Sequence, residues 1–467
     1  MINDILSDIS GFLWGFPMIV LLFGTHIFLT VRLRFPQRYI FKAIKLSVSN
    51  DKDSKGDISQ FGALATALAA TIGTGNIIGV GTAIALGGPG AVFWCWMTGV
   101  LGIATKYAEG LLAVKYRVSS NGQILGGPMY AIENGLAGSS KGAVRVFWKI
   151  MAVAFAIFTV FATFGIGSTV QANAISTVTH NIYGISPAVI GVAITVLTAA
   201  VIMGGVKSIA RCCEMLVPFM AFFYILGCIV ILCMNSAYVW PAFKLIMASA
   251  FDTTAVGAGF LGSTIMMAAR FGIARGLFSN ESGMGSAPIV AASAMTKNPV
   301  RQALVSSSGT FWDTVIICAL TGITIVSSII AYPDISAGDG GTLTKLAFSK
   351  IPYVGEPLLA IGTVTFAFST ILGWGLYGER GAGYLFDKLR PHSQKGKAAA
   401  INVFRIVFLI AVFIGAVVSL DLVWNLADIF NAFMAIPNLL CLIFLSDVIV
   451  KETRKYLWNG NIDMEGN

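Results

Sequence analysis

Long apolar stretches recur along the whole chain, separated by short segments that carry charges or Gly/Pro turns. A helix that crosses a bilayer needs about 20 mostly apolar residues. The pattern therefore predicts eleven membrane-spanning helices, over residues 12–31, 61–86, 90–113, 147–178, 187–205, 213–235, 253–293, 303–331, 357–377, 401–420 and 424–450. The expected fold class is an all-α polytopic membrane protein, because helices satisfy their own backbone groups in lipid.

Two of these spans are interrupted by glycines and polar residues. Residues 69–79 read AATIGTGNIIG, and residues 270–288 read RFGIARGLFSNESGMGSAP. Non-helical backbone at membrane depth is tolerated only inside protein or beside a wet cavity, so both interruptions indicate a binding site. Close helix packing is the other common role of such glycines, but it does not account for Asn280 and Glu281.

The positions of the interrupted spans predict an inverted repeat. Without the first helix, the spans form two groups of five, and each group begins with an interrupted helix. An odd number of spans gives the two groups opposite orientations, as in many secondary transporters. The expected units are an extra N-terminal helix with a basic cytoplasmic loop in 1–60, a first five-helix repeat in 61–235, an extracellular connector in 236–252, a second, inverted five-helix repeat in 253–450 and a cytoplasmic tail in 451–467.

Composition supports a membrane protein and excludes a water-soluble globule. Hydrophobic residues make up 56% of the chain and charged residues 11%, whereas soluble proteins contain roughly 25% charged residues. The net charge of +9 is spread over the loops, so we expect no nucleic-acid partner. The seven cysteines show no metal-type spacing.

The distribution of Lys and Arg predicts the orientation. With the N-terminus outside, 26 of the 31 cations fall in cytoplasmic segments, Lys106 among them. Only Lys244, Lys345 and Lys350 fall in outer loops, while Arg270 and Arg275 fall inside a span. This bias predicts a multi-pass protein of the cell (plasma) membrane, with the N-terminus outside and the C-terminus in the cytoplasm.

Several motifs, in the same order, resemble the alanine or glycine:cation symporters, also called the sodium:alanine symporter family. They are the segments at 70–77, 87–96 (GGPGAVFWCW), 105–109 (TKYAE), 126–130, 278–281, 285–288 and 372–374. Cys95 stands where the family usually has methionine. The resemblance covers residues 10–450 and implies a leucine-transporter-type fold of ten core helices and one extra helix.

That resemblance implies a substrate site between the interrupted helices. The amides of Thr74 and Gly75, with Asn76 beside them, would bind an amino-acid carboxylate at the positive end of a half-helix. Asn280 would face the ammonium. Gln171 is a further pocket residue, with an interhelical hydrogen bond as its alternative role, and Trp374 could wall the pocket or simply pack.

The resemblance also implies a sodium site. The adjacent hydroxyls of Ser369 and Thr370 match the hydroxyl pair of the fold's widely shared site, and alignment at Gly75 assigns the partner carbonyls to Ala69 and Ile72. The alternative is that both hydroxyls bond back to the preceding helical turn, as Ser and Thr often do in membrane helices.

Three charged residues in the second interrupted span are candidates for a gate. Arg270, Arg275 and Glu281 are costly at the bilayer midplane and could form an inner gate. Their partners would be Glu109, Asp313 or Glu379. Alternatively, part of 270–276 already lies in the cytoplasmic vestibule.

The resulting functional prediction is Na+-coupled symport of small neutral amino acids such as alanine and glycine. H+-coupled symport and amino-acid exchange are alternatives within transport, and an ion channel is an alternative of another class. No enzyme is expected, because the chain has no HExxH or GxSxG motif and no paired His/Asp cluster. We expect no cofactor besides the coupling ion Na+, a lipid bilayer as surroundings, and a monomer.

Overall fold

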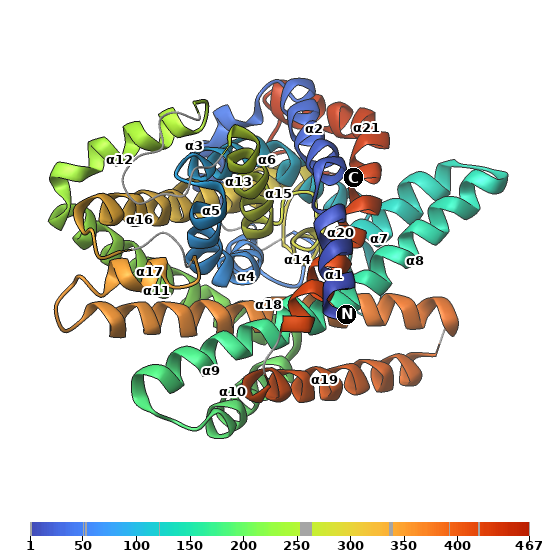
Figure 1. The fold of residues 1–467 in the computed structure, drawn as a ribbon. Helices are drawn as coiled ribbons and strands as arrows, with labels where there is room; N and C mark the ends of the chain where they lie inside the picture. The colour runs from blue at the N-terminus through green and yellow to red at the C-terminus, as the bar shows by residue number, and fades with distance from the viewer. Residues whose placement is uncertain are drawn as a thin grey trace.

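The computed structural model describes residues 2–49, 51, 54–120, 122–252, 264–335, 340–391, 393–418 and 421–466. Apart from one small hairpin, its regular elements are helices (Figure 1). The hairpin pairs β1 (Val118–Ser120) with antiparallel β2 (Gln123–Leu125).

The first half of the chain forms helices that closely follow the predicted apolar stretches. They are α1 (Ile2–Leu13), α2 (Phe16–Arg32), the short turn η1 (Pro36–Tyr39), α3 (Ile40–Ser47), α4 (Gln60–Thr71), η2 (Gly75–Gly79), α5 (Val80–Gly87), α6 (Gly90–Lys115), α7 (Pro128–Ala131), η3 (Ile132–Ala137), α8 (Gly142–Phe164), η4 (Gly165–Thr169), α9 (Val170–Tyr183), α10 (Pro187–Ile202) and α11 (Gly205–Met234).

The second half continues in the same way. Its helices are α12 (Ser236–Ser249), α13 (Ile265–Asn280), α14 (Pro288–Ala291), α15 (Pro299–Thr310), η6 (Phe311–Cys318), α16 (Ala319–Ala331), α17 (Leu343–Phe348), α18 (Gly355–Leu389), α19 (Gln394–Val417), α20 (Asp421–Phe444), α21 (Ser446–Thr453) and η7 (Arg454–Trp458). Of the predicted span 253–293, residues 253–263 lie outside the described residues.

Within the described residues, seven helices are long and apolar enough to cross a membrane. The bent pair α4 and η2–α5 raises the number to eight, and α10 is a shorter apolar helix. The chain is therefore a multi-pass membrane protein, as predicted. The total of eleven spans stays a prediction.

Loops predicted to share the cytoplasmic side are joined to one another. Arg117, just before β1, donates hydrogen bonds to the carbonyls of Lys55, Ala292 and Ala294. Likewise Arg380 of α18 bonds Gln123 of β2. We call this end of the bundle the hairpin end, and the end that holds the α5–α6 corner the opposite end. Which end faces the cytoplasm stays a prediction.

The connector predicted over 236–252 contains a helix. Its α12 lies at the edge of the molecule (Figure 1) and buries Ala242 and Ile246 in a small core with α16 residues such as Ile325. Trp240, on the other face, is 62% exposed. One apolar face is enough to fold this segment, although it is too short to be predicted as a span.

Candidate functional site

The first interrupted helix breaks where the sequence predicted. The helix α4 ends at Thr71, and the chain resumes at η2 and α5 with a bend of 52°. Asn76 stabilises the break, because its side-chain oxygen accepts the N–H of Gly73 at 2.9 Å. The amides of Thr74 and Gly75 therefore lie at the start of a half-helix, where N–H groups have no carbonyl partner within the helix.

The second break begins directly after Asn280, the last residue of α13. Glu281 has a left-handed backbone (φ 53°), and the chain becomes helical again at Pro288. The Glu281 carboxylate accepts a hydrogen bond from Trp374 Nε1 at 3.1 Å and another from the Ser286 hydroxyl. Both partners donate, so the remaining acceptor capacity of this buried carboxylate is available to a cation.

The two breaks line one cavity. Its walls are Ala70, Thr71, Gly73, Thr74 and Gly75 from the first break, Ile166 and Gln171 from η4 and α9, Phe278 and Glu281 from the second break, and Thr370 and Trp374 from α18. The cavity measures about 10 Å³, close to what a single water molecule needs. The cavity is therefore narrow and nearly closed in this structure.

Polar atoms around this cavity have unused bonding capacity. Within the described part of the chain, the buried atoms Thr74 Oγ1 and Gln171 Oε1 have no hydrogen-bond partner. Gln171 instead uses its amide nitrogen, which donates to the Ile166 carbonyl at 3.1 Å. Buried polar atoms are nearly always paired, so this arrangement indicates a site for a polar ligand.

A group of oxygen atoms adjoins the cavity at Thr370. The hydroxyls of Ser369 and Thr370 each lie 3.1 Å from the Ala69 carbonyl and 2.9 Å from the Phe366 carbonyl. The bonds to Phe366 are the back-bonds to the preceding turn that the sequence analysis gave as the alternative, and the Na+ site stays a prediction. Ile72, the fourth predicted ligand, is buried at the end of α4, and no hydrogen bond to either hydroxyl is found among the described residues.

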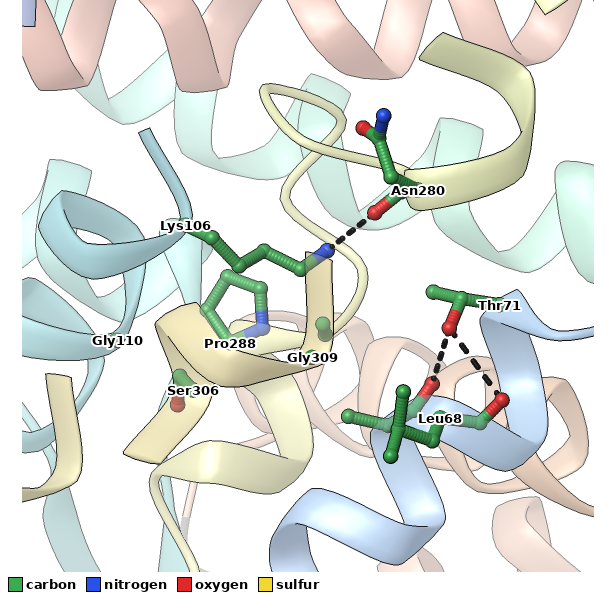
Figure 2. Close-up of a pocket in the computed structure, with 10 residues that line it drawn as sticks. Leu68, Thr71, Lys106, Gly110, Asn280, Pro288, Ser306 and Gly309 are labelled. Atoms are coloured by element: carbon green, nitrogen blue, oxygen red, sulfur yellow. Dashed lines mark hydrogen bonds between the residues drawn. The ribbon is translucent and has the colours of Figure 1, made fainter. Parts of the chain in front are cut away.

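Two predicted substrate ligands lie outside the cavity. Asn76 donates to the Asp313 carboxylate at 2.7 Å. In Figure 2 the Asn280 side chain points away from Lys106: its oxygen accepts the N–H of Ser282, and its amide nitrogen donates to the Thr98 hydroxyl. Glu281, predicted as a gate residue, takes the place beside the cavity that we expected Asn280 to occupy.

Asp313 connects the two breaks. It lies on η6, is fully buried, and accepts hydrogen bonds from Asn76 of the first break and from Ser279 Oγ of the second at 3.0 Å. Sequence reasoning named Asp313 only as a possible gate partner. Its signal was a carboxylate in an apolar span, which by itself suggests a functional position.

The partners predicted for a gate at Arg270 and Arg275 are not found with them among the described residues. Both arginines lie on α13, before the second break, and toward the opposite end. They line a cavity with Asp428 of α20. The three proposed partners have other contacts: Glu109 with Asn438, Asp313 with Asn76, and Glu379 with Arg405.

Two larger cavities lie toward the opposite end and share a wall residue with the narrow one. The first, about 340 Å³, is bounded by Thr74, and the second, about 270 Å³, by Phe278 and the two arginines. Toward the hairpin end, the neighbouring cavity beside Lys106 and Asn280 measures only about 10 Å³. The site is thus more tightly closed on the hairpin side.

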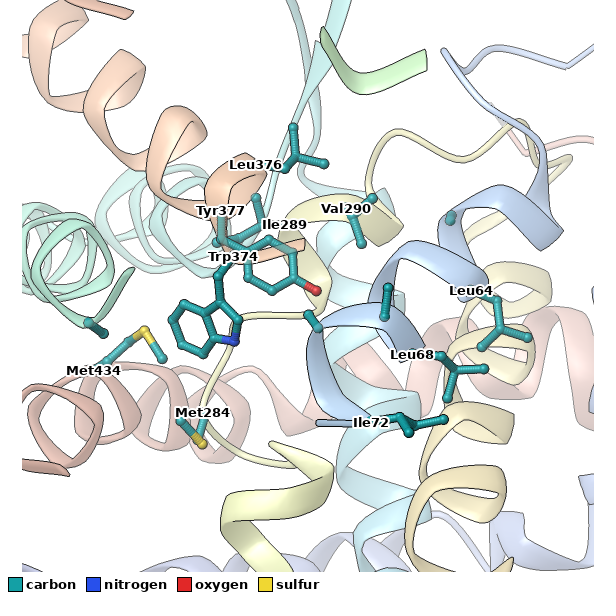
Figure 3. Packing of buried hydrophobic residues seen from close by; sticks show 14 of the residues in the cluster. Leu64, Leu68, Ile72, Met284, Ile289, Val290, Trp374, Leu376, Tyr377 and Met434 are labelled. Carbon is teal, nitrogen blue, oxygen red and sulfur yellow. The ribbon is translucent and has the colours of Figure 1, made fainter. Parts of the chain in front are cut away.

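Aromatic and aliphatic packing holds this region together. Figure 3 shows Trp374 and Tyr377 of α18 between the loop at Met284 and the end of α4 at Ile72. Trp374 is 1% exposed and Tyr377 is fully buried. The Trp374 indole therefore packs in the core and also lines the cavity, where it donates a hydrogen bond to Glu281.

Comparisons with known proteins agree with this picture. Residues 1–465 match the family model described as the sodium:alanine symporter family. The chain is 48% identical over 458 residues to the sodium/alanine symporter AgcS of Methanococcus maripaludis, which covers 97% of both proteins.

Two solved structures share the fold. One is MhsT in complex with L-phenylalanine (TM-score 0.54, 15% identity, 85% of this chain and 98% of that one). The other is a Na+-coupled sialic acid symporter in a substrate-bound outward-open state (TM-score 0.54, 13% identity, 94% and 98%). The leucine-transporter-type fold predicted from the sequence is thereby confirmed.

Proposed function

The chain belongs to the sodium:alanine symporter family, and from this premise we propose that it carries small neutral amino acids, alanine and glycine, together with Na+ by alternating access. The observation that carries the proposal is the position of Thr370, which adjoins both the proposed amino-acid site and the proposed Na+ site. This residue lines the cavity between the two breaks, and its hydroxyl belongs to the group of oxygens at Ala69.

The cavity suits both charged ends of an amino acid. The amides of Thr74 and Gly75 would bind the carboxylate at the positive end of a half-helix. Glu281 and the unpaired oxygen of Gln171 would bind the ammonium. Ile166, Phe278 and Trp374 close the remaining walls, and we expect these apolar walls to exclude a long side chain.

The oxygens at the end of α4 suit a sodium ion. We assign its ligands to the carbonyls of Ala69 and Ile72 and the hydroxyls of Ser369 and Thr370. All are neutral oxygens, which a hard cation binds, and the two hydroxyls already converge on Ala69. An ion here would tie α18 to the first break and so favour the arrangement in which the substrate amides are in place.

Access to the site would alternate between the two ends. In this structure the larger cavities lie beyond Thr74 and Phe278, whereas the hairpin side is closed around Lys106 and Asn280. Under the predicted orientation, the arginines Arg270 and Arg275 line the outer approach. The division into inverted repeats at 61–235 and 253–450 accounts for such exchange, since each repeat supplies one broken helix.

We expect Gly75→Val to abolish uptake while the protein still folds. A Cβ at Gly75 would lie 3.2 Å from the ring of Phe278, and the two further methyl groups would enter the narrow cavity. Gly24→Val in α2 is the matched control, because a Cβ there meets nothing within 4 Å. Alanine uptake and the elution profile of the purified protein in detergent should be measured for both variants. Normal uptake by Gly75→Val would contradict the assignment of the Thr74 and Gly75 amides to the substrate carboxylate.

The proposal is tested with the purified protein in liposomes. An inward Na+ gradient should concentrate radiolabelled alanine above its outside level, glycine should compete, and leucine and tryptophan should compete weakly. If the alanine concentration inside the liposomes only reaches the outside concentration, a channel would be indicated. Accumulation on a pH gradient without Na+ would replace Na+ by H+, and equal competition by leucine would contradict the small cavity.

A further inference from the structure

The continuous helix α6 runs beside the broken helix α13 (Figure 1). Their backbones nearly touch: a Cβ at Gly272 would lie 2.3 Å from the Ala91 carbonyl, and one at Gly276 would lie 2.2 Å from Thr98 Oγ1. Beyond the end of α13, α6 continues along the break loop. Lys106 and Glu109 of α6, both in the TKYAE segment at 105–109, lie beside this loop.

Lys106 binds the end of α13. Its ammonium donates to the carbonyl oxygen of Asn280 at 2.9 Å (Figure 2), and the residue is only 3% exposed. Its assignment to a cytoplasmic segment from the charge pattern is therefore wrong, because the side chain turns into the bundle. A cation at this point offsets the negative end of the half-helix and satisfies a carbonyl that the helix leaves free.

Glu109, one turn further along α6, binds the break loop itself. Its Oε1 accepts the N–H groups of Gly283 at 3.0 Å and Gly285 at 3.1 Å, and the amide of Asn438 at 2.7 Å. Both glycines have left-handed backbones, with φ of 94° and 83°, a conformation that other residues rarely adopt. The carboxylate therefore collects the amides that the break releases.

Glu281 lies between these two anchor points. The Lys106 contact fixes the residue before it, and the Glu109 contacts fix the second and fourth residues after it. With the backbone held on both sides of the left-handed turn, the Glu281 side chain points toward Trp374 and the cavity.

We infer that Lys106 and Glu109 are positioning residues, which hold the second break so that the Glu281 carboxylate meets the ammonium of the amino acid. This inference rests on the proposed function. Both side chains are buried, and between them they pair backbone groups of Asn280, Gly283 and Gly285 that the break leaves without helical partners. The consequence is selectivity at the substrate nitrogen.

The test compares alanine with N-methylalanine, whose methyl group crowds the ammonium site. In the wild type, N-methylalanine should be a much weaker competitor. In Lys106→Met and Glu109→Leu, the apparent affinity for alanine should fall about tenfold, and the preference for alanine over N-methylalanine should narrow. A change in folding alone reduces the amount of active protein and leaves this ratio unchanged.

Two polar substitutions at Glu109 separate positioning from charge. Glu109→Gln keeps the acceptor at Oε1, where all three bonds are made, whereas Oε2 has no partner among the described residues. Glu109→Asp keeps the charge and withdraws the acceptor by one carbon–carbon bond. The preference for alanine over N-methylalanine should therefore be unchanged in Glu109→Gln and smaller in Glu109→Asp. The reverse order would overturn the inference and indicate a charge-carrying role.

Lys115→Met is the matched control on the same helix. Lys115 pairs with Glu452 at 2.8 Å, at the hairpin end and away from the break. The preference of Lys115→Met for alanine over N-methylalanine should equal that of the wild type. An unchanged ratio in all Lys106 and Glu109 variants would refute the inference, whereas a wild type that fails to accumulate alanine on a Na+ gradient would refute the proposed function instead.

Discussion

Glu281→Gln should weaken alanine binding by about 10- to 100-fold, since a hydrogen bond to a charged group contributes roughly 1.5–3 kcal/mol. The substitution keeps the size of the side chain and an oxygen for the Trp374 indole. It removes the negative charge that we assign to the ammonium site and, with the amide oxygen on the Trp374 indole, places an NH2 group where Oε2 accepts the Ser286 hydroxyl. Alanine affinity of the purified protein, measured by calorimetry at saturating Na+, is the direct readout.

Glu452→Gln provides the control for this experiment. It also removes a buried carboxylate, but one that binds Lys115 at the hairpin end. Its alanine affinity should match that of the wild type. Equal affinity in Glu281→Gln would place the ammonium elsewhere in the cavity, with Gln171 as the next candidate.

The largest effect on coupling is expected for the double variant Ser369→Ala/Thr370→Val. It deletes both hydroxyls that converge on the Ala69 carbonyl and keeps the branched shape at residue 370. The Na+ concentration for half-maximal uptake should rise about 30-fold, the loss expected for two ligand oxygens at about 1 kcal/mol each. Linkage requires a matching fall in alanine affinity at limiting Na+, reversed at saturating Na+.

Thr365→Val tests whether any hydroxyl on α18 has this effect. Among the described residues, the Thr365 hydroxyl binds only the Ile361 and Gly362 carbonyls of its own helix. Its removal should leave the Na+ dependence of uptake unchanged. If the double variant also keeps the wild-type Na+ dependence, the ion binds elsewhere, and Asp313 with its oxygen-bearing neighbours becomes the first alternative.

The breaks were predictable because their sequences conflict with their surroundings. Glycines and polar residues within 69–79 and 270–288 favour an interruption, and the structure breaks the first segment after Thr71 and the second after Asn280. The group of Ser369, Thr370 and Ala69 came from the family resemblance, not from spacing, because these residues are 300 positions apart. A single sequence carries no local signal for such contacts.

The direction of individual side chains at the second break was not predictable. Asn280 and Glu281 are adjacent polar residues, and either could face the cavity. The outcome depends on the left-handed turn at Glu281, which is held by contacts from Lys106 and Glu109 on another helix. For the same reason, Lys106 looked like a loop cation: charge alone does not reveal which side chains turn inward.

The close contact between α6 and α13 also limits how the protein can move. With glycines against a carbonyl and a hydroxyl, there is no layer of side chains on which one helix could slide past the other. The bonds from Lys106 and Glu109 continue this attachment beyond the break. We therefore expect α6 and α13 to move as one rigid body. A movement that opens the hairpin side would shift both helices together. Relative movement would then occur at other contacts, such as the one between the break loop and Trp374 of α18.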